Sequence, residues 1–485
     1  MLAPTFEQRR IIEATVEMVS SPIAAAGAIK VFAGAGSGKT STLSNVAAAV
    51  RAIYPKASIL YLAYNKALKD EAALKFGGAV DTYTIHGLAM QELNLRALSR
   101  PIGDINAHHI RSVIGEFLSD SETFLIKHTV KTFVGGGDDA ITPEHVLSRY
   151  RGAALSAERK VKIAAYAEAL FDELQPGNMR SKLPIPHDVY LKYWQLIGSP
   201  GLERYDLVLY DEAQDASGCF IAALEDVGNA AYLGDPHQAI YEFRMAVDAL
   251  EKVRGRAFPM TKSFRFGQSI ADLANKILSQ KSRGLDFPLR GNETMQTLIL
   301  PVDRREPHTR IFRTNRGLIR TALILKDKNI RFSIVGKNDD IKAMVEAAWE
   351  LRNGNLARVR HYYLKSLKTW DNAVEKAEEG GEGKEIYQAV KIVQEFEQRV
   401  PEIVEILSKS TPESDALVIL TTAHRSKGRE WNNCIIAADF DPILEGAAKV
   451  KSAWDSELNL MYVAGTRAMR RLEIQCEWMG AVASA

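Results

Sequence analysis

The sequence is poor in cysteine, which limits the covalent and metal chemistry open to it. Only Cys219, Cys434 and Cys476 occur among 485 residues, far apart and without CxxC spacing. A disulfide framework and a zinc site are therefore not expected, and a reducing compartment is indicated.

Long apolar runs are missing too. No run approaches the about 20 residues that a membrane-spanning helix needs, and the opening MLAPTFEQRR has no apolar core of signal-peptide type. We therefore expect a cytoplasmic protein, of the kind found in a nucleoid or a phage-infected cell, with no membrane partner.

Charge of one sign is not in excess. Lys and Arg total 62 against 60 Asp and Glu, a formal net charge of +2. The composition gives no global basic signal, so any binding of nucleic acid must come from a local groove. With 25% charged and 46% hydrophobic residues, the chain is typical of globular proteins, and its length suits two to four domains.

Short apolar segments bounded by turn residues occur in two groups. The first group comprises Ile29–Ala33, Ile59–Tyr64, Val80–Thr84, Asp206–Tyr210 and Ala230–Leu233. The second comprises Arg310–Arg313, Phe332–Val335, Leu417–Thr421, Cys434–Ala438 and Leu472–Cys476. Such segments, apolar on both faces and followed by helical patterns, predict buried parallel strands. Two groups predict two α/β domains in tandem.

Segments of helical character interrupt each group. Ala157–Leu174 has helical periodicity with Ser156 placed to cap it, Thr142–Glu144 has proline at a first helical position, and Gly135–Gly137 forms a loop. We therefore predict a first domain from residues 1–90 and 191–267 with a helical insertion at 91–190. The second domain comprises 268–337 and 413–485, with a short helical insertion at 338–412.

A glycine-rich segment, Ala33–Thr40, follows the first expected strand and opens a helix. Glycines let backbone N–H groups turn around a phosphate, and the helix N-terminus adds a favourable dipole. Lys39 would reach the β- and γ-phosphates of ATP, and Thr40 would bind Mg²⁺. The alternative is a glycine-rich turn that happens to end in Lys-Thr, since Ala33 stands where the general phosphate-loop pattern has glycine. The strand before and the helix after favour the phosphate site.

Two acids, Asp211 and Glu212, end the apolar segment that starts at Leu207. Ligands of open α/β sheets bind at the carboxyl ends of strands. Asp211 suits Mg²⁺, directly or through water, and Glu212 suits the group that orients or deprotonates water. The alternative is a solvated acidic turn, and the presence of Lys39 and Thr40 favours the functional interpretation.

Seven motifs resemble those of the UvrD/Rep/PcrA group of superfamily 1 DNA helicases, in the same order along nearly the whole chain. They are Ala63–Lys66, Thr84–Gly87, Asp211–Asp215, Gly234–Arg244, Ser263–Arg265, Thr422–Trp431 and Tyr462–Ala468. Ile185–Lys192 and Tyr61–Lys66 most resemble the F-box DNA helicases. No separate F-box region is evident, so the ubiquitin-ligase role of those relatives is not implied.

The resemblance implies two RecA-like P-loop domains with ATP and Mg²⁺ in the cleft between them, which hydrolysis closes and opens. It assigns Gln8 to the adenine edge, Phe264 to stacking on adenine, Glu430 to the ribose and Gln238 to the γ-phosphate or its attacking water. Arg265 and Arg467 would meet the γ-phosphate, although a lone arginine more often forms a structural ion pair. The ATP-binding residues are then Gln8, Gly34, Ala35, Gly36, Ser37, Gly38, Lys39, Thr40, Ser41, Phe264, Arg265, Glu430 and Arg467.

The resemblance also implies a strand-binding face. Aromatic side chains there would stack on bases without sequence preference, and Thr84 and Asn65 could bind phosphate oxygens. The alternative for the aromatic residues is a place in the core. The expected DNA-binding residues are Tyr64, Asn65, Thr84, His86, Phe243, His424 and Trp431.

The activity implied is ATP-driven 3′→5′ translocation on single-stranded DNA with unwinding at single-strand/duplex junctions, in DNA repair or recombination. Recombination or replication proteins are the expected partners, and the oligomeric state is open, a monomer included. Because the second insertion spans only about 75 residues by these boundaries, a translocase that strips proteins from DNA and unwinds weakly stays an alternative. An RNA-directed motor and a non-catalytic, nucleotide-gated scaffold are the others.

Overall fold

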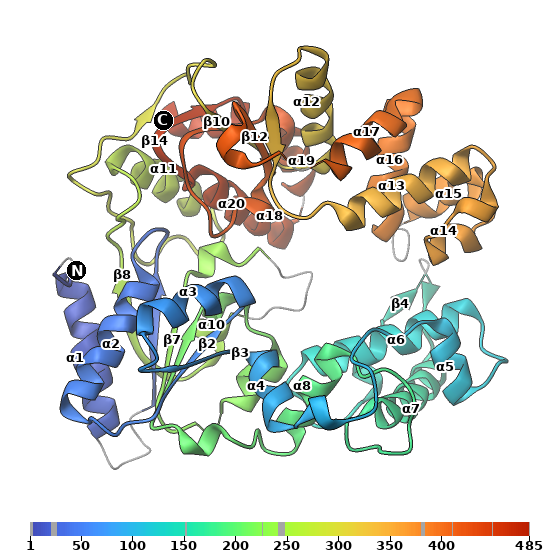
Figure 1. Cartoon of the computed structure of the whole chain (residues 1–485), viewed down its shortest axis with the longest axis horizontal. Coiled ribbons are helices and arrows are strands. Elements are labelled where there is room, and N and C mark those ends of the chain that lie inside the picture. The colour runs from blue at the N-terminus through green and yellow to red at the C-terminus, as the bar shows by residue number, and fades with distance from the viewer. Residues whose placement is uncertain are drawn as a thin grey trace. The chain divides into compact units, whose positions relative to one another are not determined.

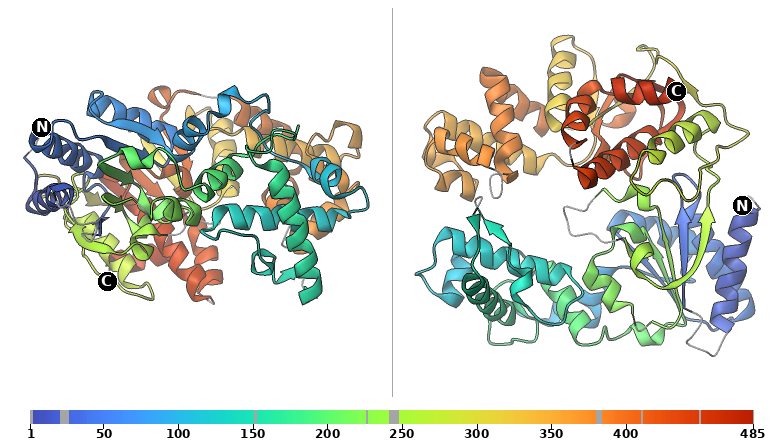
Figure 2. Two further views of the ribbon diagram at one scale, coloured as in Figure 1. Left: turned by 90° about the horizontal axis from the view of Figure 1, so that it is seen from below. Right: turned by 180° about the vertical axis from the view of Figure 1, so that it is seen from behind.

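The computed structural model describes residues 3–20, 27–150, 153–225, 227–240, 248–379, 384–409, 411–448 and 450–484 (Figures 1 and 2). The chain divides into unit 1, Met1–Thr261, and unit 2, Lys262–Ala485. This division lies six residues before the expected boundary at 267, and it assigns Phe264 and Arg265 to unit 2.

The centre of unit 1 is a six-stranded parallel sheet in the order β3-β2-β6-β7-β1-β8. The strands are β1 (Ala28–Ala33), β2 (Ile59–Ala63), β3 (Asp81–Thr84), β6 (Leu207–Asp211), β7 (Ala230–Gly234) and β8 (Gly255–Met260). Strands β2, β6 and β7 are buried throughout because their residues are apolar on both faces. The parallel α/β fold expected from the sequence is thereby confirmed for this unit.

Two edge strands differ from the sequence expectation. Strand β3 was expected to be buried on both faces, but it lies at the sheet edge with Asp81 exposed and its other residues half-buried. Strand β8 was not predicted, because its sequence GRAFPM is neither uniformly apolar nor alternating. Edge strands need only one neighbour, so their sequences carry a weaker pattern.

Helices cover both faces of this sheet. On one face, α1 (Phe6–Ser20), α2 (Lys39–Ile53) and α3 (Lys66–Phe76) form a core with the strands. On the other face lie α4 (Ile85–Glu92), α8 (His187–Leu196), α9 (Gly218–Ala223) and α10 (Ala249–Lys252). Helix α8 also packs on the insertion through Val189, so it bridges the sheet and the insertion next to the expected boundary at 190.

The insertion of unit 1 has its own core, formed mainly by α5 (Ala107–Ile114), α6 (Asp120–Gly135) and α7 (Ala157–Leu174). Ser156 caps α7 as expected, accepting a hydrogen bond from Arg159 N at 3.2 Å. The helix expected from Thr142 is only a 3₁₀ turn, Pro143–His145. A short antiparallel pair, β4 (Arg149–Tyr150) and β5 (Ala153–Ala154), was not foreseen.

Unit 2 has a second six-stranded parallel sheet, ordered β11-β12-β10-β13-β14-β9. Its strands are β9 (Leu298–Ile299), β10 (His308–Phe312), β11 (Phe332–Ile334), β12 (Val418–Thr422), β13 (Trp431–Ile436) and β14 (Ala468–Ile474). Helices α11 (Gln268–Ser279), α12 (Asn315–Asp327), α18 (Ala423–Ser426), α19 (Asp441–Ala447), α20 (Lys451–Gly465) and α21 (Glu477–Ser484) accompany it. Only β9, a two-residue edge strand, was not predicted, and the α/β expectation is confirmed for unit 2 as well.

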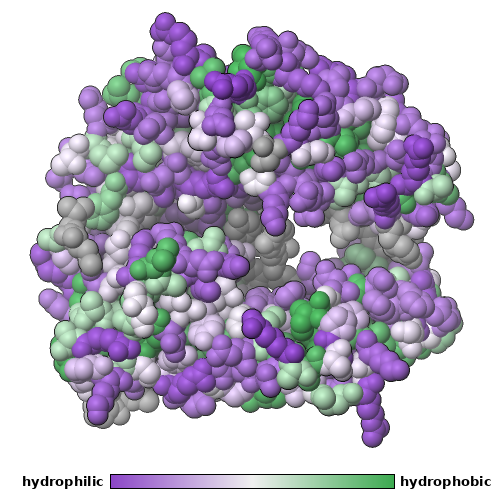
Figure 3. Space-filling model, viewed as in Figure 1, coloured by the Kyte–Doolittle hydropathy of each residue, from purple (hydrophilic) through white to green (hydrophobic). Residues whose placement is uncertain are grey.

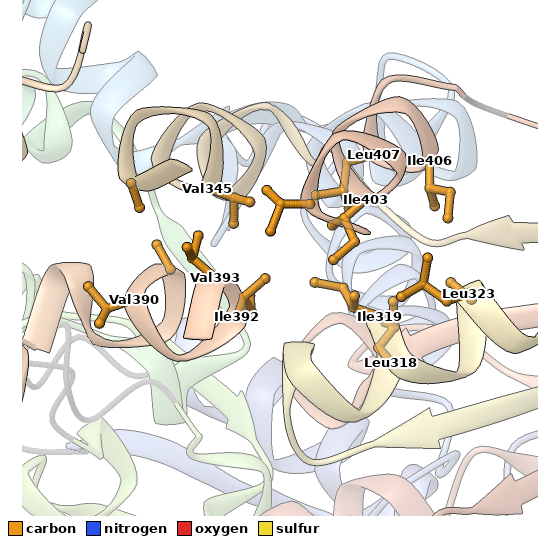
Figure 4. Close-up of a cluster of buried hydrophobic side chains, with 14 of the residues drawn as sticks. Leu318, Ile319, Leu323, Val345, Val390, Ile392, Val393, Ile403, Ile406 and Leu407 are labelled. Carbon is orange, nitrogen blue, oxygen red and sulfur yellow. The ribbon is translucent and has the colours of Figure 1, made fainter. Parts of the chain in front are cut away.

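The insertion of unit 2 is helical and shares a core with α12. Its helices are α13 (Asp339–Arg352), α14 (Tyr362–Ser366), α15 (Trp370–Glu379), α16 (Lys384–Phe396) and α17 (Val400–Ser408). Figure 4 shows Leu318, Ile319 and Leu323 of α12 facing apolar side chains of α16 and α17. This shared core attaches the insertion firmly to the sheet of its own unit.

The surface in Figure 3 is largely hydrophilic, with apolar side chains scattered over it. Scattered apolar residues are ordinary on a protein surface. Among the described residues, no helix combines the length and apolar character required to span a membrane.

Candidate functional site

The glycine-rich segment forms a loop between the end of β1 and the start of α2 (Figure 1). Gly36 and Gly38 have φ of 74° and 81°, in the left-handed region where a side chain is strained, which explains both glycines. Ala33 is still part of β1, where any residue fits, so its departure from the general pattern does not disturb the loop. The backbone N–H of Gly34 is held by the Met260 carbonyl at 3.0 Å.

This loop is suited to an anion. The first turn of α2 has no side-chain cap, since its N-cap residue is Gly38. The Oγ of Ser37 is buried and has no hydrogen-bond partner among the described residues. An uncapped helix N-terminus beside an unsatisfied hydroxyl donor is suited to binding phosphate oxygens.

Lys39 lies opposite the acids that β6 delivers. Its Nζ is 3.3 Å from Oε1 of Glu212, and the two side chains are 13% and 16% exposed. Burial alone lowers the pKa of Lys39, but the carboxylates of Glu212, Asp211 and Asp235 outweigh it and raise the pKa above its usual value. Lys39 therefore remains a cation at any physiological pH.

Asp211 is held by three donors. Its Oδ2 accepts hydrogen bonds from Tyr61 Oη at 2.9 Å and Thr40 Oγ1 at 3.4 Å, and its Oδ1 accepts one from Glu212 N at 2.9 Å. Burial, followed by repulsion from Glu212, raises the pKa of Asp211 to about 6. A carboxylate and a hydroxyl this close are hard oxygen ligands, the donor set that Mg²⁺ takes together with nucleotide phosphates and water. Both residues fit the metal role expected of them.

Glu212 itself is fixed by its backbone and by Gln214. It has φ of 58°, unusual for a residue other than glycine, and such strain often accompanies functional positions. Gln214 Nε2 donates to Glu212 Oε2 at 2.5 Å, while Gln214 Oε1 accepts from Asp235 N at 2.9 Å. A Cβ at Gly234 would meet Gln214 Oε1 at 2.5 Å, so glycine is needed there. Gln214 thus connects the ends of β6 and β7.

Three more residues of unit 1 are assigned to ATP by the sequence: Gln238, Gln8 and Ser41. Gln238 donates from Nε2 to Asp235 Oδ2 at 2.7 Å, which links it to the same network. Gln8 is buried in α1, and its amide bonds Thr42 Oγ1 at 3.0 Å and Thr5 N at 2.9 Å. Ser41 is exposed in the first turn of α2.

Within unit 2, three motifs converge around Arg265. Its Nε donates to Glu430 Oε2 at 2.6 Å, and its Nη1 donates to the Thr466 carbonyl at 3.3 Å. Arg467 is 1% exposed, and its guanidinium bonds the carbonyls of Val463 and Arg429 at 2.7 and 3.1 Å and Thr466 Oγ1 at 3.0 Å.

Arg467 therefore contacts backbone and hydroxyl oxygens, whereas Arg265 contacts one carbonyl and the half-exposed carboxylate of Glu430. Phe264, beside Arg265, is half-buried.

Four DNA-binding candidates of unit 1 gather at the carboxyl ends of β2 and β3, which are neighbours in the sheet. Asn65 caps α3 through Leu68 N at 3.0 Å, and Thr84 caps α4 through Gly87 N at 3.1 Å. His86 Nε2 is 3.1 Å from Asp188 Oδ1. Tyr64 is half-buried.

A cavity of about 420 Å³ opens beside this edge of unit 1. The N-termini of α3 and α4 and three basic side chains lie at this cavity. Its lining residues are Lys66, Lys69, Tyr83, Thr84, Gly87, Met90, Gln91, Asn94 and Arg96. Basic side chains beside polar amide and hydroxyl groups suit a phosphodiester chain.

The remaining DNA-binding candidates are Trp431, His424 and Phe243. Trp431 packs against Val335, Ala416 and Ile419, and its indole N–H is 3.4 Å from Glu413 Oε2. His424 is half-buried in α18, and burial followed by the charge of Arg313 lowers its pKa to about 4. Phe243 lies outside the described residues.

The polar network around Lys39, Thr40, Asp211 and Glu212 is the candidate nucleotide centre, called the nucleotide centre below. Sequence reasoning missed three residues that contact or face it: Tyr61, Gln214 and Asp235. Gln214 and Asp235 lie inside motifs that the sequence displays, so their position was available but their contacts were not. Tyr61 carried one signal, because a tyrosine within a strand buried on both faces needs a partner for its hydroxyl.

Comparison with known proteins places these motifs in a family context. A family model described as an AAA domain matches residues 16–244. F-box DNA helicase protein 1 of Schizosaccharomyces pombe is 30% identical, over 96% of this chain and 57% of its own length. Over nearly its whole length, the chain is homologous to that protein. F-box DNA helicase 1 of Gallus gallus is 27% identical, over 96% of this chain and 48% of its own length. The resemblance expected from the motifs is thereby confirmed.

The chain spans about half the length of the curated relatives it matches. Among solved structures, Pif1 helicase from Candida albicans gives a TM-score of 0.39 at 12% identity, covering 99% of this chain and 97% of its own. An arterivirus nonstructural protein 10 helicase with DNA gives 0.34 at 10% identity, covering 98% and 66%.

Proposed function

We propose that this protein is an ATP-driven motor that moves 3′→5′ along single-stranded DNA and unwinds duplex at single-strand/duplex junctions. The observation that carries the proposal is the meeting of Lys39, Thr40, Asp211 and Glu212 at the carboxyl ends of β1 and β6. The printed names of the homologous proteins, DNA helicases, support DNA as the substrate.

The chemistry proposed for unit 1 follows from its contacts. Lys39 would leave Glu212 to bind the β- and γ-phosphates, which frees the Glu212 carboxylate to orient the attacking water. Thr40 and Asp211 would hold Mg²⁺, which neutralises charge on the phosphates when bound. Gln214 would keep Glu212 in place, and Gln238, joined to Asp235, would lie close enough to respond to the γ-phosphate.

Arg265 and Arg467 are proposed to stabilise charge on the transferred phosphoryl group, as the resemblance of their motifs implies. A guanidinium suits this task because it is planar and always charged. Arg265 is the more readily released of the two, because its main partner, Glu430, is half-exposed. Arg467 would first have to give up several carbonyl contacts.

The DNA track proposed for unit 1 is the edge formed by the ends of β2 and β3. The Asn65 amide and the Thr84 hydroxyl can each still donate a hydrogen bond to phosphate after capping a helix, and Lys66, Lys69 and Arg96 supply charge. Such contacts hold a strand without reading its sequence.

The experiment is ATP hydrolysis by the whole chain alone, with single-stranded DNA and with RNA, followed by unwinding of 3′-tailed and 5′-tailed duplexes. We expect strong stimulation by single-stranded DNA and unwinding of the 3′-tailed duplex, with Lys39→Ala inactive in both assays. Hydrolysis that DNA does not stimulate would refute the proposal, and preference for the 5′ tail would refute the polarity.

The same experiment distinguishes the alternatives. Stimulation by RNA above DNA indicates an RNA motor. Displacement of a DNA-bound protein without unwinding indicates a translocase that strips proteins from DNA. The observation that favours this alternative is the short insertion α13–α17 of unit 2. Absence of hydrolysis with retained nucleotide binding indicates a scaffold.

A further inference from the structure

The hydroxyl of Tyr61 is a polar group in the middle of an apolar core. Tyr61 is 0% exposed and lies in β2, where its ring is 5.2 Å from that of Phe76, and the surrounding core is formed by apolar residues of β1, β6 and α2. A buried hydroxyl without a partner costs stability, so such a group is normally satisfied. Here its partner is a carboxylate of the nucleotide centre.

The register of the sheet explains how Tyr61 reaches that carboxylate. β2 and β6 are adjacent and parallel, and Tyr61 is level with Leu209, two residues before Asp211. Residues two apart on a strand lie on the same face, so Leu209 and Asp211 share the face on which the Tyr61 ring packs. The tyrosine therefore extends along β6 and donates to Asp211 Oδ2 at 2.9 Å.

The three donors to Asp211 differ in what happens to them when nucleotide arrives. Thr40 Oγ1, at 3.4 Å, is the group expected to turn toward Mg²⁺. Glu212 N belongs to the strained backbone at the end of β6, and it holds the other oxygen, Oδ1. Tyr61 alone is fixed by packing on all sides and holds the oxygen that Thr40 shares.

We propose that Tyr61 is a positioning residue, which orients the Asp211 carboxylate toward Mg²⁺ through its buried hydrogen bond. This inference rests on the proposed nucleotide site and adds a residue to it that lies outside the seven motifs. Hydrogen bonds to a metal-binding carboxylate fix its rotamer, and their loss typically weakens metal binding by about 10- to 100-fold.

The test compares Tyr61→Phe with the parent chain in binding a ribose-labelled fluorescent ADP while Mg²⁺ is titrated, without DNA. We expect the Mg²⁺ concentration for half-maximal nucleotide binding to rise by about tenfold or more, while nucleotide binding in EDTA stays unchanged. Tyr232→Phe is the matched control, because it removes a buried hydroxyl from the same sheet on the opposite face.

Two further measurements separate positioning from a general structural role. Mg²⁺ demands near-octahedral ligands whereas Ca²⁺ accepts irregular ones, so Tyr61→Phe should weaken Mg²⁺ more than Ca²⁺. This ratio is measured within one preparation, so a reduced fraction of folded protein does not affect it. In an Asp211→Asn background, Tyr61→Phe should have no further effect on Mg²⁺.

The outcomes are distinct. An unchanged Mg²⁺ requirement, or equal losses for Mg²⁺ and Ca²⁺ that persist beside Asp211→Asn, would overturn the role of Tyr61. If DNA does not stimulate ATP hydrolysis by the parent chain, the proposed motor is refuted, while the Mg²⁺ result remains valid. A parent chain that binds no nucleotide at all would overturn both.

Discussion

The ion pair between Lys39 and Glu212 makes an unusual prediction, namely that a hydrolysis-defective variant should bind nucleotide more tightly. The two charged atoms are 3.3 Å apart and both side chains are largely buried. Since the β- and γ-phosphates require the same Nζ, Glu212 competes with the nucleotide for Lys39. Glu212→Gln keeps the size and a neutral hydrogen bond but removes the competing charge.

The magnitude follows from the geometry. Two unit charges at this separation attract by about 5 kcal/mol at an effective dielectric constant of 20, and desolvation offsets much of that. With a neutral hydrogen bond retained, the difference between Glu and Gln is about 1–2 kcal/mol. At 1.36 kcal/mol per factor of ten, ATP should bind about 5- to 30-fold more tightly. Hydrolysis should fall by about 100-fold or more, because the Glu212 carboxylate is no longer present to act on water.

The assay is equilibrium binding of a fluorescent ATP derivative with Mg²⁺, together with single-turnover hydrolysis. Glu225→Gln is the matched control, since Glu225 is exposed in the same unit and lies outside the nucleotide centre. If Glu212→Gln binds ATP more weakly than the parent chain, Glu212 does not compete for Lys39. If it hydrolyses ATP at the parental rate, the role of Glu212 in catalysis is wrong.

Three further predictions concern residues away from this ion pair. Arg265→Ala should lower DNA-stimulated hydrolysis by about 10³-fold with little change in melting temperature, whereas Arg467→Ala should also lower the melting temperature, because Arg467 is buried against its own unit. Thermal melting beside hydrolysis per folded molecule measures both, and intact hydrolysis in either variant removes that arginine from catalysis. Arg100 donates to five carbonyls at 2.7–3.2 Å, three of them at the end of α7; Arg100→Met should destabilise the insertion of unit 1 by about 3–5 kcal/mol in urea unfolding, and a loss below 1 kcal/mol would contradict this. The pKa of His424 is about 4 in the folded protein against a usual 6.5, so its contribution to stability is complete above pH 6.5 and is lost as the pH falls toward 4. Between those values His424→Gln should remove about 3 kcal/mol of pH dependence from the free energy of unfolding, and an unchanged dependence would show that His424 titrates normally.

The sequence predicted ten strands of the two sheets, because buried parallel strands are short and apolar on both faces. It missed β8 and β9 and placed β3 in the interior, and all three are edge strands whose residues need satisfy only one neighbour. Helical insertions were visible from periodicity. The helical pattern of α8 did not show that this helix packs on both the insertion and the sheet.

The sequence by itself indicated four polar residues of the candidate nucleotide centre, although it did not indicate Asp235. Lys39 and Thr40 follow a strand and a glycine-rich loop, and Asp211 and Glu212 end another strand, so their spacing alone indicates phosphate and metal chemistry. The sequence also predicted part of the backbone conformation of the glycine-rich loop, because Gly36 and Gly38 occupy backbone angles that only glycine adopts without strain.

Only the tertiary structure decided which of these groups touch and what supports them. Tyr61 meets Asp211 because β2 lies beside β6, an order that chain sequence does not give, since more than 140 residues separate them. The contacts of Arg467 with carbonyls of its own unit likewise depend on how helices and strands pack. The same holds for the contact between Lys39 and Glu212. Local sequence fixes the backbone conformation and the chemical groups available, whereas long-range packing fixes their distances, and those distances set the electrostatics of the site.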